Sequence, residues 1–422
     1  MQFIFITIAL AGAGYFLFAK REFDILSVGY VSAFVYFSPG FTGEVMYPME
    51  QSQVFGYPVP IHPETYLVMA FVLIALWGAA LIFDLTARRS VPNIPFSAHP
   101  SFLTYAIGYT HLGMIMTWIT LGVDVMTSPD KNDILAVFSR WSILWTSGSV
   151  IAFVLAFEQK RTILLLIAGI PLMVEMYAGF RTSLAIAVIS VTCLWLNQQG
   201  AGRLAVNHWR ILLLGSVMAA FLFIYKFLFS AIKAEDWGLV LVLLANPTLY
   251  SNAFLNSEPF FTQSVLNEVI REDFQVGLGH FASIPLSFVL FAPELGWVLP
   301  SFSEIMHPRL FPNLVESGIA ANVWAEMLSA GGWVLLSIFA CLFVLALCWG
   351  SYLIRAPDPV WRSVIVSAFC LLAFYVHRNE LQFQITLEKR TLLFIALCWI
   401  TSRISFFRGI KISVARRTSP LP

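Results

Sequence analysis

Long apolar runs recur along this chain of 422 residues, and they constrain its fold more than any other feature. A run of about 18 or more apolar residues is long enough for an α-helix to cross a bilayer. The composition agrees, because 59% of the residues are hydrophobic and only 12% are charged, which is about half the charged share of a soluble domain. An outer-membrane barrel would instead show strands of alternating polar and apolar residues. The sequence therefore predicts an all-α, polytopic membrane protein with residues 1–422 as a single integral membrane domain.

Hydropathy and charge predict the spans and their orientation. Most Lys and Arg residues near span ends, including Lys20, Arg21 and the tail from Arg403 to Arg417, fall on one side of the predicted topology. The positive-inside rule makes that side cytoplasmic, with the N-terminus outside and the C-terminus inside. The ninth span is long enough to include a short membrane-dipping element before Gly331 and Gly332. We expect about eleven spans, at residues 2–19, 25–41, 64–83, 101–123, 136–157, 162–178, 181–197, 211–230, 320–354, 360–376 and 386–402.

Residues 231–319 form one large external loop in this topology, and a loop of that length with apolar content is usually functional. Within it, residues 281–299 are apolar but contain Pro285 and Pro293, which oppose a continuous helix. We interpret that stretch as interfacial or re-entrant, covered by protein. The loop is expected to carry short helices, one of them amphipathic and lying on the membrane, because apolar side chains recur at helical spacing at Val265, Leu266, Val269, Ile270 and Phe274.

Arg181 is the most informative cation on the outer side. It follows Gly179 between two apolar runs, where it would open a helix whose N-terminus is itself an anion site. An ion at the membrane edge is costly, so it suggests a function. The alternatives are a structural pair with Glu175 and simple snorkelling of the side chain.

Two further groups of ionisable residues lie outside. Arg378, Lys389 and Arg390 belong to a short outer loop, where they could bind an anion or anchor the interface by pairing with acidic neighbours. The large loop adds Arg271 and Arg309. Three residues near them are candidate general bases, although each could equally make ordinary loop or interface contacts: His280, His307 and Glu326.

Converging arginines favour an anionic ligand, since guanidinium binds phosphate oxygens through a planar fork. In a membrane protein that ligand is a lipid phosphate or diphosphate, and a cation cluster can stabilise departing diphosphate without metal. No D-x-D pair lies on the outer face, and no P-loop or G-x-G-x-x-G motif is present. The net charge of +1 and the five cysteines in apolar runs indicate no nucleic-acid partner, disulfide framework or zinc site. We expect no metal and no cofactor.

Two local motifs resemble those of the Wzy-type O-antigen or oligosaccharide repeat-unit polymerases. The first is Ala178-Gly179-Phe180-Arg181-Thr182-Ser183-Leu184, at a helix start. The second follows the large loop and reads Ser317-Gly318-Ile319, then Trp324-Ala325-Glu326-Met327, then Gly331-Gly332-Trp333.

The resemblance implies a metal-independent inverting glycosyltransferase with a helical fold of the GT-C type. It would act on the periplasmic face of the bacterial inner membrane, in lipopolysaccharide biosynthesis, with an undecaprenyl-diphosphate-linked glycan as both donor and acceptor. A chain-length regulator would be a further partner, besides the lipid bilayer. Arg181, Arg378, Lys389 and Arg390 would hold the diphosphates. Arg271 and Arg309 would bind the second carrier or its sugars, and His307, His280 or Glu326 would take the acceptor proton.

Three other functions remain open at this point. An O-antigen ligase would transfer finished glycan to the lipid A core with the same external arginines and histidines. A transporter or flippase of lipid-linked sugars often shows inverted repeats and broken midplane helices, whereas this sequence shows no internal repeat and carries its basic excess at the outer rim. A scaffold subunit of a membrane complex is the third.

Overall fold

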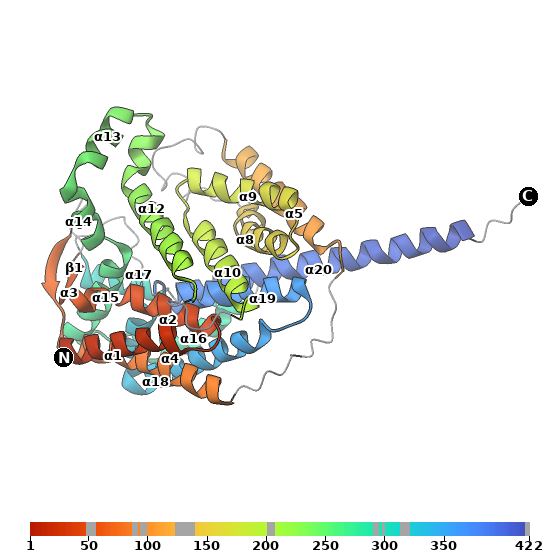
Figure 1. The fold of residues 1–422 in the computed structure, drawn as a ribbon. Helices are drawn as coiled ribbons and strands as arrows, with labels where there is room; N and C mark the ends of the chain where they lie inside the picture. The colour runs from red at the N-terminus through yellow and green to blue at the C-terminus, as the bar shows by residue number, and fades with distance from the viewer. Residues whose placement is uncertain are drawn as a thin grey trace, which may run out of the picture. The chain divides into compact units, whose positions relative to one another are not determined.

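The structure is a computed structural model that describes residues 1–47, 56–86, 92, 99–122, 140–200, 207–289, 295–297, 300–312 and 321–417. It is about 80% helical, which confirms the all-α class (Figure 1). One small antiparallel hairpin joins β1 (Glu44–Tyr47) to β2 (Tyr57–Pro60), with Val45 opposite Val59.

The chain forms two compact units. Unit 1 comprises Met1–Arg89, Trp195–Tyr352 and Phe369–Leu387, and unit 2 comprises Ser90–Leu194, Leu353–Ala368 and Glu388–Pro422. Helices described within unit 1 are α1 (Gln2–Gly14, continued by a π-helical turn at Tyr15–Ala19), α2 (Ile25–Tyr36), α3 (Pro39–Thr42), α4 (Pro63–Thr86), α12 (Trp209–Lys233), α13 (Trp237–Ala245), α14 (Pro247–Leu255), α15 (Glu258–Arg271), α16 (Leu278–Ser283), the 3-10 turn η2 (Ile284–Phe288) and α17 (Phe302–Leu310).

Unit 2 is built around three helices that pack on one another, α5 (Phe102–Leu121), α8 (Ser142–Glu158) and α9 (Thr162–Tyr177). Gly148 permits a close approach, because an added Cβ there would lie 2.3 Å from the Thr110 hydroxyl and 2.6 Å from the Phe394 ring. Four helices contribute residues to both units or link them along the chain: α10 (Thr182–Gln198), α18 (Val323–Leu353), α19 (Pro359–Tyr375) and α20 (Leu381–Arg417).

Each predicted span overlaps a described helix. Among the residues that the structure describes, three helical stretches are long and apolar enough to cross a membrane, namely Gln2–Ala19, Pro63–Thr86 and Val323–Leu353. Shorter apolar helices of 10–17 residues occupy several of the other predicted spans. The helices are thus confirmed, while the number that cross a bilayer stays a prediction.

The α18 helix breaks at two glycines, where the sequence predicts a short element before the main span. Gly331 has φ −157° and ψ 23°, and Gly332 has φ 61° and ψ −157°. A positive φ of this kind is readily adopted only by glycine. The short first segment therefore carries Glu326 on a different axis from the long apolar segment that follows.

The large loop does carry short helices, as predicted, but its amphipathic helix is not laid on a membrane. Helix α15 packs against α2, α4 and β1, and its apolar side chains Val265, Leu266 and Val269 are at most 3% exposed. Contacts with protein bury this apolar face, so the prediction that it lies on the membrane was wrong. Hydrophobic spacing reports burial, but it does not say what covers the buried face.

The apolar stretch 281–299 begins with two short elements, the end of α16 and η2, of six and five residues. Neither is long enough to span a bilayer. This agrees with the predicted non-spanning segment for its described part, while residues 290–294 and 298–299 lie outside the described residues.

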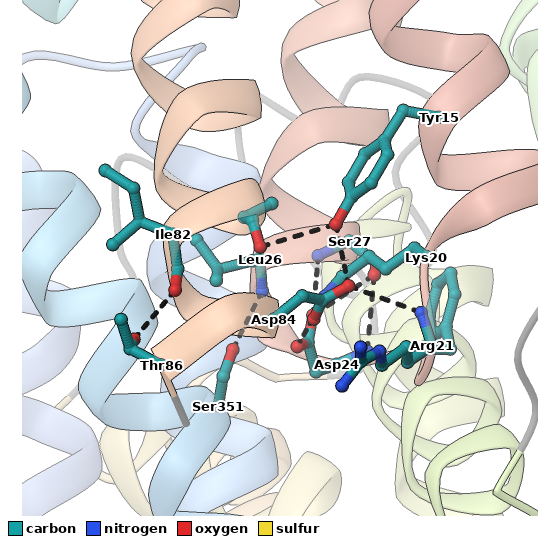
Figure 2. Close-up of polar contacts among 12 residues, drawn as sticks. Tyr15, Lys20, Arg21, Asp24, Leu26, Ser27, Ile82, Asp84, Thr86 and Ser351 are labelled. Atoms are coloured by element: carbon teal, nitrogen blue, oxygen red, sulfur yellow. Dashed lines mark hydrogen bonds and ion pairs between the residues drawn. The ribbon is translucent and has the colours of Figure 1, made fainter. Parts of the chain in front are cut away.

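A buried ion cluster joins α1, α2 and α4 (Figure 2). The Lys20 ammonium lies 2.9 Å from the Asp24 carboxylate and 3.2 Å from that of Asp84, and the Lys20 side chain is 2% exposed. Tyr15 donates to the second Asp84 oxygen at 2.6 Å. Asp24 also caps α2 by accepting from Ser27. The cluster fixes the ends of three helices with one cation and two carboxylates.

Replacing this cation should destabilise unit 1. Lys20→Met leaves both carboxylates without a cation in a poorly hydrated site, and breaking such a pair typically costs about 3–5 kcal/mol. We expect a clearly lower thermal unfolding midpoint in detergent. Arg21→Ala is the matched control, because Arg21 is exposed and reaches Asp84 through its backbone N–H. Unfolding of Lys20→Met at the parent temperature would contradict this role.

Candidate functional site

Polar side chains from α15, α16, α17, the start of α18 and the turn before α20 meet within unit 1. We call this set the polar cluster: Thr262, His280, Ser303, Asn322, Glu326, His377 and Glu380. Hydrogen bonds join its members across elements that are far apart in sequence, for example over 46 residues between His280 and Glu326 and 77 between Ser303 and Glu380.

The centre of the polar cluster is a buried histidine–carboxylate pair. His280 Nε2 lies 3.0 Å from Glu326 Oε1, and the two side chains are 3% and 0% exposed. The other Glu326 oxygen accepts from the Leu381 backbone N–H at 2.7 Å. Both carboxylate oxygens therefore have donors, which fixes the orientation of Glu326 and, through it, the imidazole.

The glycine break of α18 helps to place His280. The backbone N–H groups of Val276 and Gly277 both point to the Ser329 carbonyl, at 3.1 and 3.4 Å. Gly277 has φ +79°, a conformation that favours glycine. These hydrogen bonds hold the segment before α16 against Ser329. Ser329 lies about one helical turn after Glu326 and just before the glycine break of α18.

This geometry selects one tautomer of His280. A carboxylate only accepts hydrogen bonds, so neutral His280 carries its proton on Nε2 and presents a lone pair on Nδ1. Within the described part of the chain, Nδ1 is buried and has no hydrogen-bond partner. A histidine held by a carboxylate, with its opposite nitrogen unpartnered, has the hydrogen-bonding arrangement of a general base.

A second buried histidine has a different environment. His377 Nδ1 accepts from the Trp324 indole N–H at 3.2 Å, and the imidazole lies among the rings of Tyr36, Phe37 and Phe343. Burial lowers the pKa of His377 to about 3. A neutral imidazole enclosed by aromatic rings holds the start of α18 against the turn before α20, which is a structural role.

Asn322 and Glu380 fix the starts of two helices. Asn322 accepts from the backbone of Trp324 at 2.9 Å and donates to the Thr262 carbonyl at 3.1 Å. Glu380 accepts from the Ser303 backbone N–H in the first turn of α17 at 2.7 Å. Burial raises the pKa of Glu380. Both residues tie the large loop to the apolar helices.

Two of the predicted anion-binding arginines are paired with acids. Arg378 lies 3.1 Å from Glu258, and its guanidinium is over the Tyr375 ring at 5.5 Å. Arg271 lies 3.0 Å from Glu268 but remains 44% exposed. Burial raises the pKa of Glu268. Because Arg271 is more exposed than Arg378, it can more readily exchange its acidic partner for a ligand.

Arg309 is connected to His280 through aromatic rings. Its guanidinium lies 5.9 Å from the Phe274 ring, which contacts Phe302 at 6.3 Å, and Phe302 contacts His280 at 6.4 Å. Arg309 is exposed on α17. The third predicted base, His307, is half-buried on the same helix, and burial lowers its pKa.

The structure divides the predicted cations between the two units. Arg181, Lys389 and Arg390 are half-buried residues of unit 2. Glu175, the predicted structural partner of Arg181, accepts from the Ser149 hydroxyl at 2.7 Å. The predicted motif at residues 317–319 lies outside the described residues.

Sequence reasoning missed Asn322 and Glu258 as parts of the site, and it named Trp324 only within a motif. Asn322 had a readable signal, because an asparagine just before an apolar helix is a favoured cap. No local pattern pairs Glu258 with Arg378, since they are 120 positions apart in sequence and only the fold brings them together.

The low pKa of His377 predicts acid sensitivity. The unfolded chain would protonate this histidine near its ordinary pKa of 6.5, whereas the folded chain resists protonation down to about 3. Stability should therefore fall as pH drops below about 6.5, by at most about 1.4 kcal/mol per pH unit from this group. In His377→Asn, the unfolding midpoint should depend less steeply on pH between 7 and 5. An unchanged slope would contradict the prediction, and comparison with the parent cancels the contributions of Glu380 and Glu268.

Among the described residues, no group of three His, Cys, Asp or Glu side chains could hold a metal ion. No family model, curated protein or solved structure matches the chain. The site's own residues supply an oriented histidine, a fixed carboxylate and, on the same loop, exposed guanidinium groups.

Proposed function

We propose that this chain is a membrane glycosyltransferase of the repeat-unit polymerase type. It joins oligosaccharide units carried on undecaprenyl diphosphate at the periplasmic face of the inner membrane. The observation that carries the proposal is the buried His280–Glu326 pair, in which the carboxylate orients the imidazole and leaves Nδ1 as an acceptor without a partner among the described residues.

The proposed reaction is a single displacement. The acceptor hydroxyl attacks the anomeric carbon of the donor glycan, and the bond from that carbon to the diphosphate oxygen breaks as configuration inverts. His280 Nδ1 takes the hydroxyl proton, and the diphosphate leaves with the bonding electron pair. Glu326 is a positioning residue that also stabilises the imidazolium as it forms.

Cations near the pair would stabilise the leaving group. Arg309 and Arg271 are exposed, and Arg309 connects to His280 through two phenylalanine rings. Guanidinium groups bind diphosphate oxygens bidentately, and this counters the charge that develops as the sugar–phosphate bond breaks. In the predicted topology both arginines belong to the external loop, which would put a diphosphate at the outer rim.

A lipid substrate is supported by the apolar character of both units. Three helices of the described part of the chain are long and apolar enough to cross a membrane. Unit 2 contains an apolar groove of about 570 Å³ between α5, α8 and α9, lined by residues that include Phe153, Ile170 and Tyr177. Arg181 follows four residues after Tyr177 in the chain. A groove of this lining suits an apolar lipid chain bound to unit 2.

Substitution of the proposed base tests this function. His280→Gln should lower kcat for glycan extension by about 10²–10⁴-fold, the usual contribution of a general base, with little change in KM. Glu326→Gln should lower kcat as well and alter the acidic limb of the pH–rate profile, because the imidazole loses its orienting carboxylate.

His62→Gln is the matched control, because His62 is an exposed histidine of unit 1. All variants should insert in membranes and elute as the parent does. Parental kcat in His280→Gln would overturn the assignment of the base.

A further inference from the structure

The C-terminal part of α20 carries cations and no acids. Glu388 is the last acidic residue in the sequence, so residues 389–422 contain no Asp or Glu. Charged side chains on an exposed helix usually alternate in sign and pair one turn apart. No pair of that kind can form along residues 403–417, whose five cations are Arg403, Arg408, Lys411, Arg416 and Arg417.

The length of α20 relates these cations to the membrane surface. The helix is continuous from Leu381 to Arg417, over 37 residues (Figure 1), and is therefore about 55 Å long at 1.5 Å per residue. A hydrocarbon core of about 30 Å takes up only about 20 residues. Measured from Arg390, the last cation of the outer loop in the predicted topology, the inner boundary of the core falls at about residue 410. Arg408 and Lys411 then lie at the level of the lipid headgroups.

Arg416 and Arg417 lie within electrostatic reach of the same surface. They follow Lys411 by at most about 9 Å along the helix axis. The headgroup region extends several Å beyond the hydrocarbon, and charges interact over a Debye length of about 8 Å at physiological ionic strength. We call the four residues at this end of α20 the tail cations: Arg408, Lys411, Arg416 and Arg417.

Arg403 is not one of the tail cations, because it precedes the inner boundary by about 10 Å. Its guanidinium lies 5.6 Å from the Trp399 ring. A long side chain that packs along an apolar or aromatic surface can extend its charge toward the interface. Packing on its own helix therefore accounts for Arg403 without a ligand.

Two general rules account for only part of this charge. The helix dipole favours cations in the last turn, which covers Arg416 and Arg417 but neither Arg408 nor Lys411. The positive-inside rule counts Lys and Arg and is nearly indifferent to Asp and Glu. It therefore explains why cations lie on this side, but not why acidic residues are absent from the same stretch. A negatively charged partner explains both.

The sequence between the tail cations favours lipid as that partner. Aromatic and aliphatic residues separate or precede the cations, where a helix projecting into water would carry polar residues. Basic and apolar residues interleaved in this way are typical of helices at a membrane interface, where phosphates and acyl chains lie close together. The apolar positions are Phe406, Phe407, Ile410, Ile412 and Val414.

We propose that the tail cations form a binding surface for anionic phospholipids of the cytoplasmic leaflet. Their partners are headgroups with a net negative charge, as in phosphatidylglycerol and cardiolipin. Clusters of about four to eight Lys and Arg residues directly after a membrane span bind such lipids, and each cation near the surface raises association about fivefold. The inference rests on the membrane location in the proposed function, but not on glycosyl transfer.

A spin label between the tail cations tests the surface directly. A single cysteine replaces Ser413 in a chain whose five native cysteines are changed to alanine, and it is labelled with a nitroxide. The full-length protein is reconstituted in vesicles of phosphatidylcholine, with or without phosphatidylglycerol. Phosphatidylglycerol should lower the mobility of the label. High salt should restore it, because salt screens exposed charges.

Charge variants assign this response to the tail cations. The response to phosphatidylglycerol should be lost in the fourfold variant Arg408→Gln, Lys411→Gln, Arg416→Gln and Arg417→Gln. The matched control changes Arg408, Arg416 and Arg417 to lysine, which keeps the charge and should keep the response. Size-exclusion elution and flotation with the vesicles check that each variant is folded and inserted.

Three results would overturn the proposal. Equal label mobility in both kinds of vesicle would show that the tail has no preference for anionic lipid. A response that persists in the glutamine variant would place the lipid contact elsewhere on the chain. Immobilisation by polyuridylate or polyglutamate, without a response to phosphatidylglycerol, would indicate a nucleic-acid or protein partner instead. Failure of the parent to float with vesicles would contradict the membrane location itself, whereas glycan extension is measured separately.

Discussion

A polar group shielded from water must find its partner inside the protein, and this constraint organises the whole chain. Only 12% of the residues are charged, and the buried ions described here have partners. Lys20 is paired with two aspartates, and Glu326 takes donors on both oxygens.

The proposed chemistry depends on one of the buried polar atoms that have no hydrogen-bond partner among the described residues. His280 has a partner on Nε2 and a buried, unpartnered acceptor on Nδ1. His377, by contrast, uses Nδ1 to accept from Trp324 and sits within aromatic rings. His377 also has a buried ring nitrogen without a partner among the described residues, Nε2, but this nitrogen carries the proton because Nδ1 accepts from Trp324. In the proposed reaction His280 would accept the substrate proton, whereas His377 packs around the start of α18.

Local patterns in the sequence predicted the helices and the glycine break, because apolar run length and φ preference are local properties. They also selected His280 and Glu326 separately, but not their contact, which joins α16 to α18. The prediction that α15 lies on the membrane was wrong. The sequence pattern indicates that Val265 and Val269 are buried, but it does not indicate whether protein or lipid covers them. The ion pair of Arg378 with Glu258 depends on the fold in the same way. Arg181, Lys389 and Arg390 belong to the other unit, so their grouping with the loop cations stays a prediction.

The most direct test of the central claim uses the purified full-length chain in liposomes with undecaprenyl-diphosphate-linked repeat units and no other protein. The account predicts stepwise lengthening of the glycan, with one undecaprenyl diphosphate released for each new glycosidic bond. Movement of the lipid-linked units across the bilayer at constant glycan length would contradict it and indicate a transporter. Product formation only when lipid A core is supplied would likewise contradict polymerisation and indicate a ligase.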